Sequence, residues 1–215
     1  MSFTFRCVEV EADAPLLHSW MTRQYASFWG MLTASVDDVV EEYSRIQSSG
    51  HHHALVGLDG GVPAFLMEEY LPGCSPLAGV YAVQPEDIGM HLLVAPASGG
   101  PRSGYTTAVM EAVLERLFEK PGVERVVVEP DARNTKIHAL NERLGFQPAG
   151  VVELPDKQAL LSFCTRADFH TAQAAIHRAA IPEPAHPPDS DQASVQAAGH
   201  TPAIRQSTSH QGASL

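Results

Sequence analysis

Hydrophobic positions recur with two different spacings along residues 1–169. Short apolar or alternating segments bounded by turn residues, which are typical of strands, cover residues 3–10, 52–59, 62–70, 88–96, 123–130 and, as one or two strands, 151–169. Apolar residues three and four apart, which are typical of helices, cover residues 13–21, 35–47, 103–120 and 135–144. The resulting order, β-α-α-β-β-β-α-β-α-β-β, predicts an α/β (α+β) domain.

The turn chemistry supports these segments. Ser35 and Asp38 have the spacing of a capping box at the start of one helix, and Gly145 is placed to end another. Asp59-Gly60-Gly61 predicts a tight hairpin between two strands.

The composition changes near Phe169. Residues 170–215 are rich in Ala, Pro, Ser, Gln and His and contain no aromatic residue, so they offer too little apolar surface to offset the entropy of ordering. We therefore expect one domain over residues 1–169 and a disordered tail over residues 170–215, with at most a transient helix over residues 172–180.

The negative net charge makes two kinds of binding partner unfavourable. The formal net charge is −11, and nearly all of it precedes the tail, which disfavours binding to nucleic acid or to an anionic membrane. Cys7, Cys74 and Cys164 are scattered, so they signal neither a disulfide framework nor a zinc site. We find no secretory signal and no apolar run long enough to span a membrane, and we expect a cytoplasmic protein.

Candidate chemistry lies where predicted strands end. Glu129-Pro130-Asp131 follows a buried strand, and ligands of α/β sheets bind beyond such ends. Residues 98–104 are rich in Gly and Ser and open onto a helix, which suits a phosphate or is an ordinary connection. His51, His52 and His53 are consecutive on a predicted strand and alternate between its faces, so they cannot converge on one metal ion, and we expect no metal there.

The segment that begins at Asn134 carries a family resemblance. Ile137, Leu140, Gly145 and Phe146 follow Asn134 with the spacing of the N-x-x-[AS]-x-x-L-Y-x-x-x-G-F helix, so residues 1–169 resemble the GNAT acyl-CoA-dependent N-acyltransferases. The stretches HSWM, FWGM, GVPAFLMEEY, DIGMHLLVAP, RVVVEPDARNTKIHALNERLGF and LPDKQALLSFCTR are similar to a narrower group, the acyltransferases of hydroxamate siderophore biosynthesis. That group acts on lysine, N-hydroxylysine and N-hydroxycadaverine.

The resemblance implies a fold and its ligands. It implies a mixed central sheet flanked by helices and splayed between MHLLV and RVVVE, with the pantetheine arm of acetyl- or succinyl-CoA in the gap. The cofactor-binding residues that it implies are Leu92, Leu93, Val94, Arg102, Ser103, Gly104, Tyr105, Thr106, Asn134 and Asn141. The substrate-binding residues are Trp29, His53 and Glu68, and the partner is a small N-hydroxylated amine; the oligomeric state is left open.

The resemblance also implies a catalytic pair, His91 and Asp131. Asp131 is the expected proton acceptor, with His91 orienting the acceptor and a backbone N–H near Leu92 or Leu93 stabilising the oxyanion. The alternatives are a structural histidine and a helix-capping aspartate. Asn141 stands where the family often has a tyrosine that protonates the thiolate, and an amide does not titrate. Lys157 either binds an acyl carboxylate or is a strand-edge charge.

Two other functions fit the same pattern. An aminoglycoside 6'-N-acetyltransferase shares the scaffold and also favours an acidic acceptor pocket. A non-catalytic acyl-CoA-binding module would keep the fold without turnover.

Overall fold

The computed structural model describes residues 2–96, 100 and 102–179. The strands are β1 (Phe3–Cys7), β2 (His52–Asp59), β3 (Val62–Tyr70), β4 (Asp87–Val94), β5 (Arg125–Val128), β6 (Gln147–Glu153) and β7 (Gln158–Thr165). The helices are α1 (Val10–Met21), α2 (Val36–Ser49), α3 (Tyr105–Glu119), α4 (Thr135–Arg143) and α5 (Arg166–Ala179), with short 3-10 helices η1 (Gln24–Trp29), η2 (Pro72–Cys74) and η3 (Pro76–Gly79). The predicted order of strands and main helices is confirmed, and α5 follows it.

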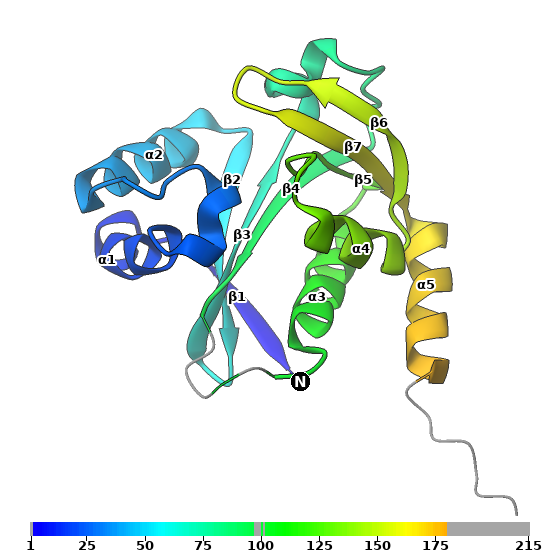
Figure 1. Cartoon of the computed structure of the whole chain (residues 1–215), viewed down its shortest axis with the longest axis horizontal. Helices are drawn as coiled ribbons and strands as arrows, with labels where there is room; N and C mark the ends of the chain where they lie inside the picture. The colour runs from blue at the N-terminus through cyan, green and yellow to red at the C-terminus, as the bar shows by residue number, and fades with distance from the viewer. Residues whose placement is uncertain (1, 97–99, 101, 180–215) are drawn as a thin grey trace, which may run out of the picture. The chain divides into compact units, whose positions relative to one another are not determined.

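The strands form one mixed sheet in the order β1-β2-β3-β4-β5-β7-β6 (Figure 1). Only β4 and β5 pair in parallel, and all other neighbours are antiparallel. The predicted hairpin joins β2 to β3, and Gly60 and Gly61 at its tip both have positive φ, which residues with a Cβ rarely adopt.

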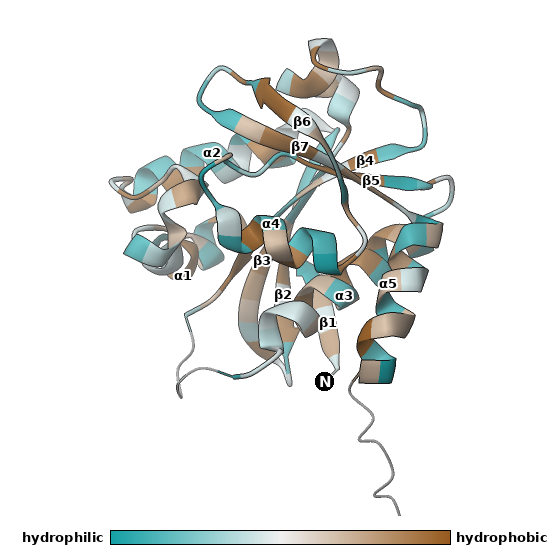
Figure 2. Ribbon diagram, turned by 45° about the vertical axis from the view of Figure 1, so that its right-hand side comes forward, coloured by the Kyte–Doolittle hydropathy of each residue, from teal (hydrophilic) through white to brown (hydrophobic). Residues whose placement is uncertain are grey.

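Helices cover both faces of the sheet (Figures 1 and 2). On one face, α1 and α2 pack on side chains such as Val56, Leu66 and Leu93. On the other face, α3 and α5 pack on side chains such as Phe65 and Met67. Since side chains alternate along a strand, the residues next to Leu66 and Leu93 in this alternation, Glu68 and His91, lie on the α1–α2 face.

The central strands separate in the middle of the sheet. Pairing between β4 and β5 covers only Asp87–Arg125, Ile88–Val126 and Gly89–Val127, although β4 continues to Val94. The predicted splay is therefore present, and the second half of β4 has no β5 partner among the described residues.

Two element boundaries differ from the sequence expectation. Residues 8–10 were assigned to the first strand, but α1 begins at Val10 because the Asp13 carboxylate accepts a hydrogen bond from the Glu9 N–H at 2.8 Å and pairs with Arg6 at 2.6 Å. Local side-chain contacts therefore start the helix earlier than its apolar spacing suggests.

The second difference is at the end of the domain. Helix α5 continues to Ala179, and buried Phe169 stacks on Phe118 of α3 with ring centroids 5.6 Å apart. The domain boundary predicted after Phe169 falls within this helix, so the folded domain extends further along the chain than expected. The rest of the predicted tail, residues 180–215, lies outside the described residues.

Candidate active site

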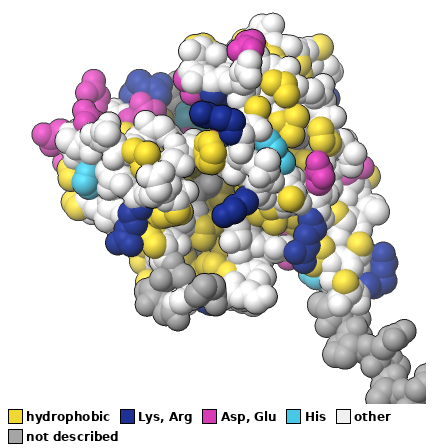
Figure 3. Space-filling view, viewed as in Figure 1, with side chains coloured by type: hydrophobic (Ala, Val, Ile, Leu, Met, Phe, Trp, Pro, Cys, Tyr) yellow, Lys and Arg dark blue, Asp and Glu magenta, His cyan; other side chains and the backbone are white. Residues whose placement is uncertain are grey.

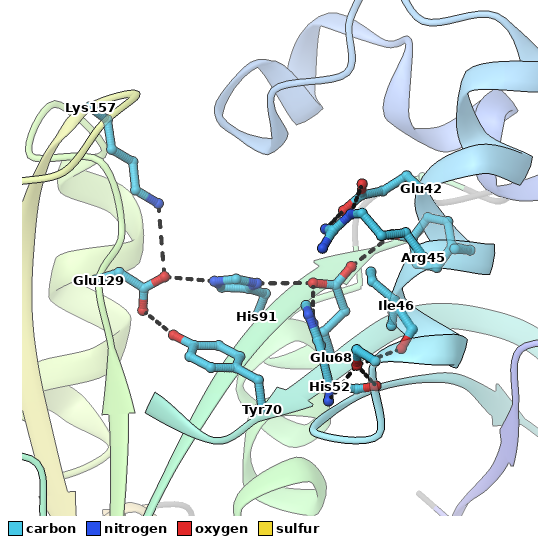
Figure 4. Close-up of polar contacts among 11 residues, drawn as sticks. Glu42, Arg45, Ile46, His52, Glu68, Tyr70, His91, Glu129 and Lys157 are labelled. Atoms are coloured by element: carbon cyan, nitrogen blue, oxygen red, sulfur yellow. Dashed lines mark hydrogen bonds and ion pairs between the residues drawn. The ribbon is translucent and has the colours of Figure 1, made fainter. Parts of the chain in front are cut away.

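His91 lies at the centre of the site, between two buried carboxylates (Figure 4). Its Nδ1 is 2.9 Å from Oε2 of Glu68, which stands directly opposite it on β3. Its Nε2 is 2.6 Å from Oε1 of Glu129, the residue that follows β5. An ionised carboxylate only accepts hydrogen bonds, so both ring nitrogens donate, and the ring is an imidazolium, when Glu68 and Glu129 are both ionised.

Two tyrosines hold the carboxylates in place. The Tyr43 hydroxyl donates to Oε1 of Glu68 at 2.8 Å, and the Tyr70 hydroxyl donates to Oε2 of Glu129 at 2.7 Å. The Tyr70 ring reaches Glu129 by crossing over Gly89, where a Cβ would lie 2.2 Å from the ring. A glycine in β4 is therefore a condition for this contact.

The charges of the three groups are strongly coupled. Burial alone would lower the pKa of His91, but the negative charges of Glu129 and Glu68 outweigh it and raise the pKa to about 10. Burial would raise the pKa of both carboxyls, but hydrogen bonds from His52 and His91 lower that of Glu68, and the charge of His91 lowers that of Glu129. The cluster is thus ionised at neutral pH.

A cleft of about 810 Å³ opens over this cluster, in the hollow visible in the space-filling view (Figure 3). Its wall includes Leu92 and Leu93 of β4, and Lys157 reaches in from the β6–β7 hairpin to 4.0 Å from Oε1 of Glu129. Its acidic lining residues outnumber its lysines and arginines; they are Asp38, Glu41, Glu42, Glu68, Glu129, Asp131 and Asp156, against Arg45 and Lys157.

The expected acceptor residues divide between the two faces of the sheet. Trp29 and Glu68 line the cleft, with the Trp29 ring edge-on to His91 at 6.2 Å between centroids. His53 does not: it lines a separate cavity of about 150 Å³, together with Glu69 and Lys120. His52 takes the expected place because alternation along β2 turns it toward Glu68, at 3.2 Å.

The expected cofactor residues lie along β4 and at the starts of α3 and α4. Val94 ends β4, packed against the α3-side core. Gly104 caps α3 with φ of 73°, followed by Tyr105 and Thr106, and Arg102 pairs with Asp59 at 2.7 Å. Ser103 precedes this cap, while residues 97–99 and 101 of the predicted phosphate loop lie outside the described part.

Two amides face the cleft from the α4 side. Asn134 and Asn141 both line it, and Asn141 is only 3% exposed. The side-chain Oδ1 of Asn141 has no hydrogen-bond partner among the described residues. A buried polar atom left unpaired costs about 1–3 kcal/mol, so this position favours a bound ligand that donates to it.

Asp131 lines the cleft but is engaged elsewhere. Its carboxylate accepts from the Arg133 side chain at 2.7 and 2.9 Å and from the Arg133 backbone N–H at 2.8 Å. These contacts lower the pKa of Asp131 to about 2. Within the described residues no hydrogen bond joins it to His91, so the structure pairs His91 with Glu129 and not with Asp131.

A family model agrees with this fold. The model for the acetyltransferase (GNAT) domain matches residues 9–154, which is more than half of the chain. The chain belongs to the GNAT acetyltransferase family. The predicted family, fold and enzyme class are thereby confirmed.

Named relatives of this GNAT protein differ in their acceptors. It is 28% identical to an N-hydroxyputrescine acetyltransferase of Acinetobacter baumannii, over 79% of this chain and 80% of the relative. It is 27% identical to a lysine N-acyltransferase of a Mycobacterium species, over 74% of this chain and only 65% of that longer protein. It is also 27% identical to an aminoglycoside N(6')-acetyltransferase of Klebsiella pneumoniae, over 78% of this chain and 85% of the relative.

Solved structures agree on the fold. An aminoglycoside acetyltransferase determined with coenzyme A superposes with a TM-score of 0.70 at 23% identity, covering 80% of this chain and 99% of the other. No described helix of the GNAT protein is long and apolar enough to cross a membrane.

Several site residues escaped the sequence prediction. Glu129, Tyr43, Tyr70 and His52 complete the network around His91. One of them had a usable sequence signal. Side chains alternate along β5, so Glu129 lies on the same face of the sheet as Val127, which packs with Tyr70. The hydrogen-bond partners of His91 depend on the register of the paired strands, and the sequence alone does not reveal that register.

Proposed function

We propose that this GNAT protein transfers an acetyl or succinyl group from acyl-CoA to the hydroxylamine nitrogen of an N-hydroxylated diamine, forming a hydroxamate for siderophore biosynthesis. The observation that carries the proposal is the position of the Glu68–His91–Glu129 cluster at the floor of the cleft, beside the gap between β4 and β5. A thioester bound in that gap would lie next to the cluster.

The cofactor side supports acyl-CoA as the donor. Beyond Gly89, the β5-facing edge of β4 has no strand partner in the described ranges and can pair with the amides of a pantetheine arm, as one strand pairs with another. The start of α3 offers backbone N–H groups and a helix dipole to the pyrophosphate. Asn141 offers an unused oxygen at the same gap.

The acceptor side supports a small cationic molecule. The excess of carboxylates in the cleft favours the ammonium at the far end of a diamine. A hydroxylamine nitrogen is less basic than an alkyl amine and is neutral at physiological pH, so it can attack without prior deprotonation. The match to an N-hydroxyputrescine acetyltransferase supports this class of acceptor.

The transfer needs one proton acceptor. The nitrogen attacks the thioester carbonyl, a C–N bond forms, the C–S bond breaks, and the nitrogen loses a proton. Both Glu129 and Asp131 are hydrogen-bonded, and we assign the role to Glu129 because it belongs to the His91 cluster beside the gap between β4 and β5, whereas Asp131 pairs with Arg133 outside that cluster. The coenzyme A thiolate leaves and takes its proton from water, since the Asn141 amide does not titrate and therefore cannot act as a general acid.

A matrix of donors and acceptors tests the proposal. Acetyl-CoA and succinyl-CoA are each combined with N-hydroxycadaverine, N-hydroxyputrescine and the parent diamines, and thioester cleavage is followed. We expect kcat/KM to be highest for an N-hydroxylated diamine. Equal rates with the parent diamines would contradict the hydroxylamine assignment.

An aminoglycoside acceptor is the second candidate. It is favoured by the aminoglycoside-acetylating relative and by the acidic lining of the cleft. Kanamycin in the same matrix separates the two, because only one acceptor class should saturate at micromolar to millimolar concentration. Saturable acyl-CoA binding without turnover on any acceptor would instead indicate a binding module.

The proposal includes a cytoplasmic location. The three cysteines are free, as is usual in a reducing compartment.

A further inference from the structure

One group of metal-ligating side chains stands out among the described residues. His52, Glu68 and His91 each offer one ligand atom, and these atoms all lie within 4.8 Å of one another. The three residues come from β2, β3 and β4, which are adjacent strands of one sheet (Figure 4). A sheet fixes its side chains more precisely than a loop does, so the group is preorganised.

The spacing of the ligand atoms suits a small metal ion. Oε2 of Glu68 is 2.9 Å from Nδ1 of His91 and 3.2 Å from Nε2 of His52. Ligands at about 2.0–2.1 Å from a tetrahedral zinc ion are about 3.3 Å apart, so both separations from Glu68 fit, and the two imidazole nitrogens, which lie within 4.8 Å of each other, would close in on the ion. We propose that His52, Glu68 and His91 form a binding site for a divalent transition metal ion, with Zn²⁺ as the best fit, and that its occupation blocks acyl transfer.

The surroundings of two of the ligands, His91 and Glu68, match those of known metal sites. Metal-bound histidines usually donate their other ring N–H to a carboxylate, and Nε2 of His91 faces Glu129 at 2.6 Å. The second oxygen of Glu68 accepts from the Tyr43 hydroxyl at 2.8 Å, which fixes the orientation of the carboxylate. Both ligands are therefore held by outer contacts that a bound ion would leave in place.

The ligand set also selects the metal. Two imidazoles and one carboxylate favour Zn²⁺ and its transition-metal neighbours, whereas Mg²⁺ and Ca²⁺ prefer oxygen ligands alone. Three protein ligands leave further coordination positions open toward the cleft, which supplies an entry path. On binding, the ion replaces the proton on Nδ1 of His91.

Inhibition follows from the location of the site. An ion on Nδ1 of His91 would occupy the floor of the cleft, where the acceptor nitrogen must approach. This consequence rests on the proposed function, whereas metal binding itself does not.

The chain provides a matched pair of variants. His52→Gln removes one ligand but keeps an amide that can hydrogen-bond to Glu68. His53→Gln makes the identical change one residue later, on the opposite face, beside the smaller cavity. Each variant leaves ten of the eleven histidines, so any adventitious binding to other histidines is the same in both.

Co²⁺ is the direct probe, because its visible absorption reports coordination by protein nitrogen without any need for turnover. We titrate Co²⁺ into the full chain and displace it with Zn²⁺. The wild type and His53→Gln should show a saturable band that Zn²⁺ removes, and His52→Gln should lose it. If His52→Gln does not fold, His52→Phe is used in its place, because a phenyl ring keeps the aromatic contact with Tyr70.

Inhibition is measured by thioester cleavage, with each variant normalised to its own metal-free rate. Half-inhibition of His52→Gln should need at least about tenfold more Zn²⁺ than that of His53→Gln. Equal Co²⁺ binding by the two variants would overturn the site, and binding without inhibition would overturn its effect. If no acceptor is turned over, the proposed function is wrong, but the Co²⁺ titration still shows whether His52, Glu68 and His91 bind a metal ion.

Discussion

The two walls of the cleft differ in how completely their polar groups are paired. On the β3–β4 wall, Glu68 and His91 pair with each other and with Glu129, which reaches across from the end of β5, and two tyrosines anchor the carboxylates. On the α4 wall, within the part of the chain that the structure describes, Asn141 keeps an unpaired oxygen and the facing edge of β4 lacks a strand partner. The polar groups of the first wall are hydrogen-bonded within the protein, whereas those of the second wall are available to hydrogen-bond with a ligand.

This difference suggests a division of roles. A paired and rigid cluster suits proton transfer, which requires fixed geometry, and unpaired groups suit the binding of an extended cofactor. The predictions below test each wall separately.

The largest effect is expected from Glu129→Gln. If Glu129 accepts the proton from the acceptor, turnover should fall about a hundred- to ten-thousand-fold while acyl-CoA affinity is kept. Asp131→Asn should cost less than about tenfold, because the Asp131 carboxylate is held by Arg133. Thioester cleavage at saturating acyl-CoA measures both, and a larger loss in Asp131→Asn would return the role to Asp131.

A smaller effect is expected from Asn141→Leu on the other wall. Removing an unpaired buried amide should leave the free energy of unfolding unchanged or raise it by about 1–3 kcal/mol. The KM for acyl-CoA should rise about tenfold if the amide contacts the cofactor, with little change in kcat. Chemical denaturation and initial rates measure the two effects, and an unchanged KM would remove Asn141 from the cofactor site.

The smallest effect concerns pH. The pKa of Asp131 is lowered to about 2, below its ordinary value near 4, so its ionised form stabilises the fold. The stability difference between wild type and Asp131→Asn should be constant above about pH 5 and should disappear as the pH falls through 4 toward 2. Arg133 is 81% exposed, so solvent screens this ion pair and keeps the stability difference small. The denaturation midpoints of both proteins across this pH range test the prediction. A stability difference that grows in acid would contradict it.

Much of the fold could be predicted from the sequence, because its signals are local. The capping box of Ser35 and Asp38 forms as expected, and the Asp59-Gly60-Gly61 turn joins the predicted strands. The start of α1 was misplaced because it depends on Asp13, whose partner Arg6 lies in another element.

The site was less predictable, since it depends on which side chains meet across strands. His91, Glu68 and Trp29 were identified through a family resemblance, and all three line the cleft. His53 was chosen in place of His52 because the resemblance did not fix which residues of β2 face the cleft. The sequence predicts Asp131 as the proton acceptor, and our proposal of Glu129 in its place rests on the fold-back of Arg133 onto Asp131, which only the structure reveals.

The run His51-His52-His53 has a consequence for the evolution of this site. A slip of one residue in β2 turns every side chain of the strand to the opposite face. With three histidines in succession, a slip in either direction still turns an imidazole toward Glu68. A one-residue slip would nevertheless carry Val56 or Leu58 into the place of Gly57, where a Cβ would lie 2.0 Å from the Phe65 ring. Insertions or deletions that shift β2 are therefore selected against by its packing, and this packing, rather than the histidine run, keeps His52 turned toward Glu68.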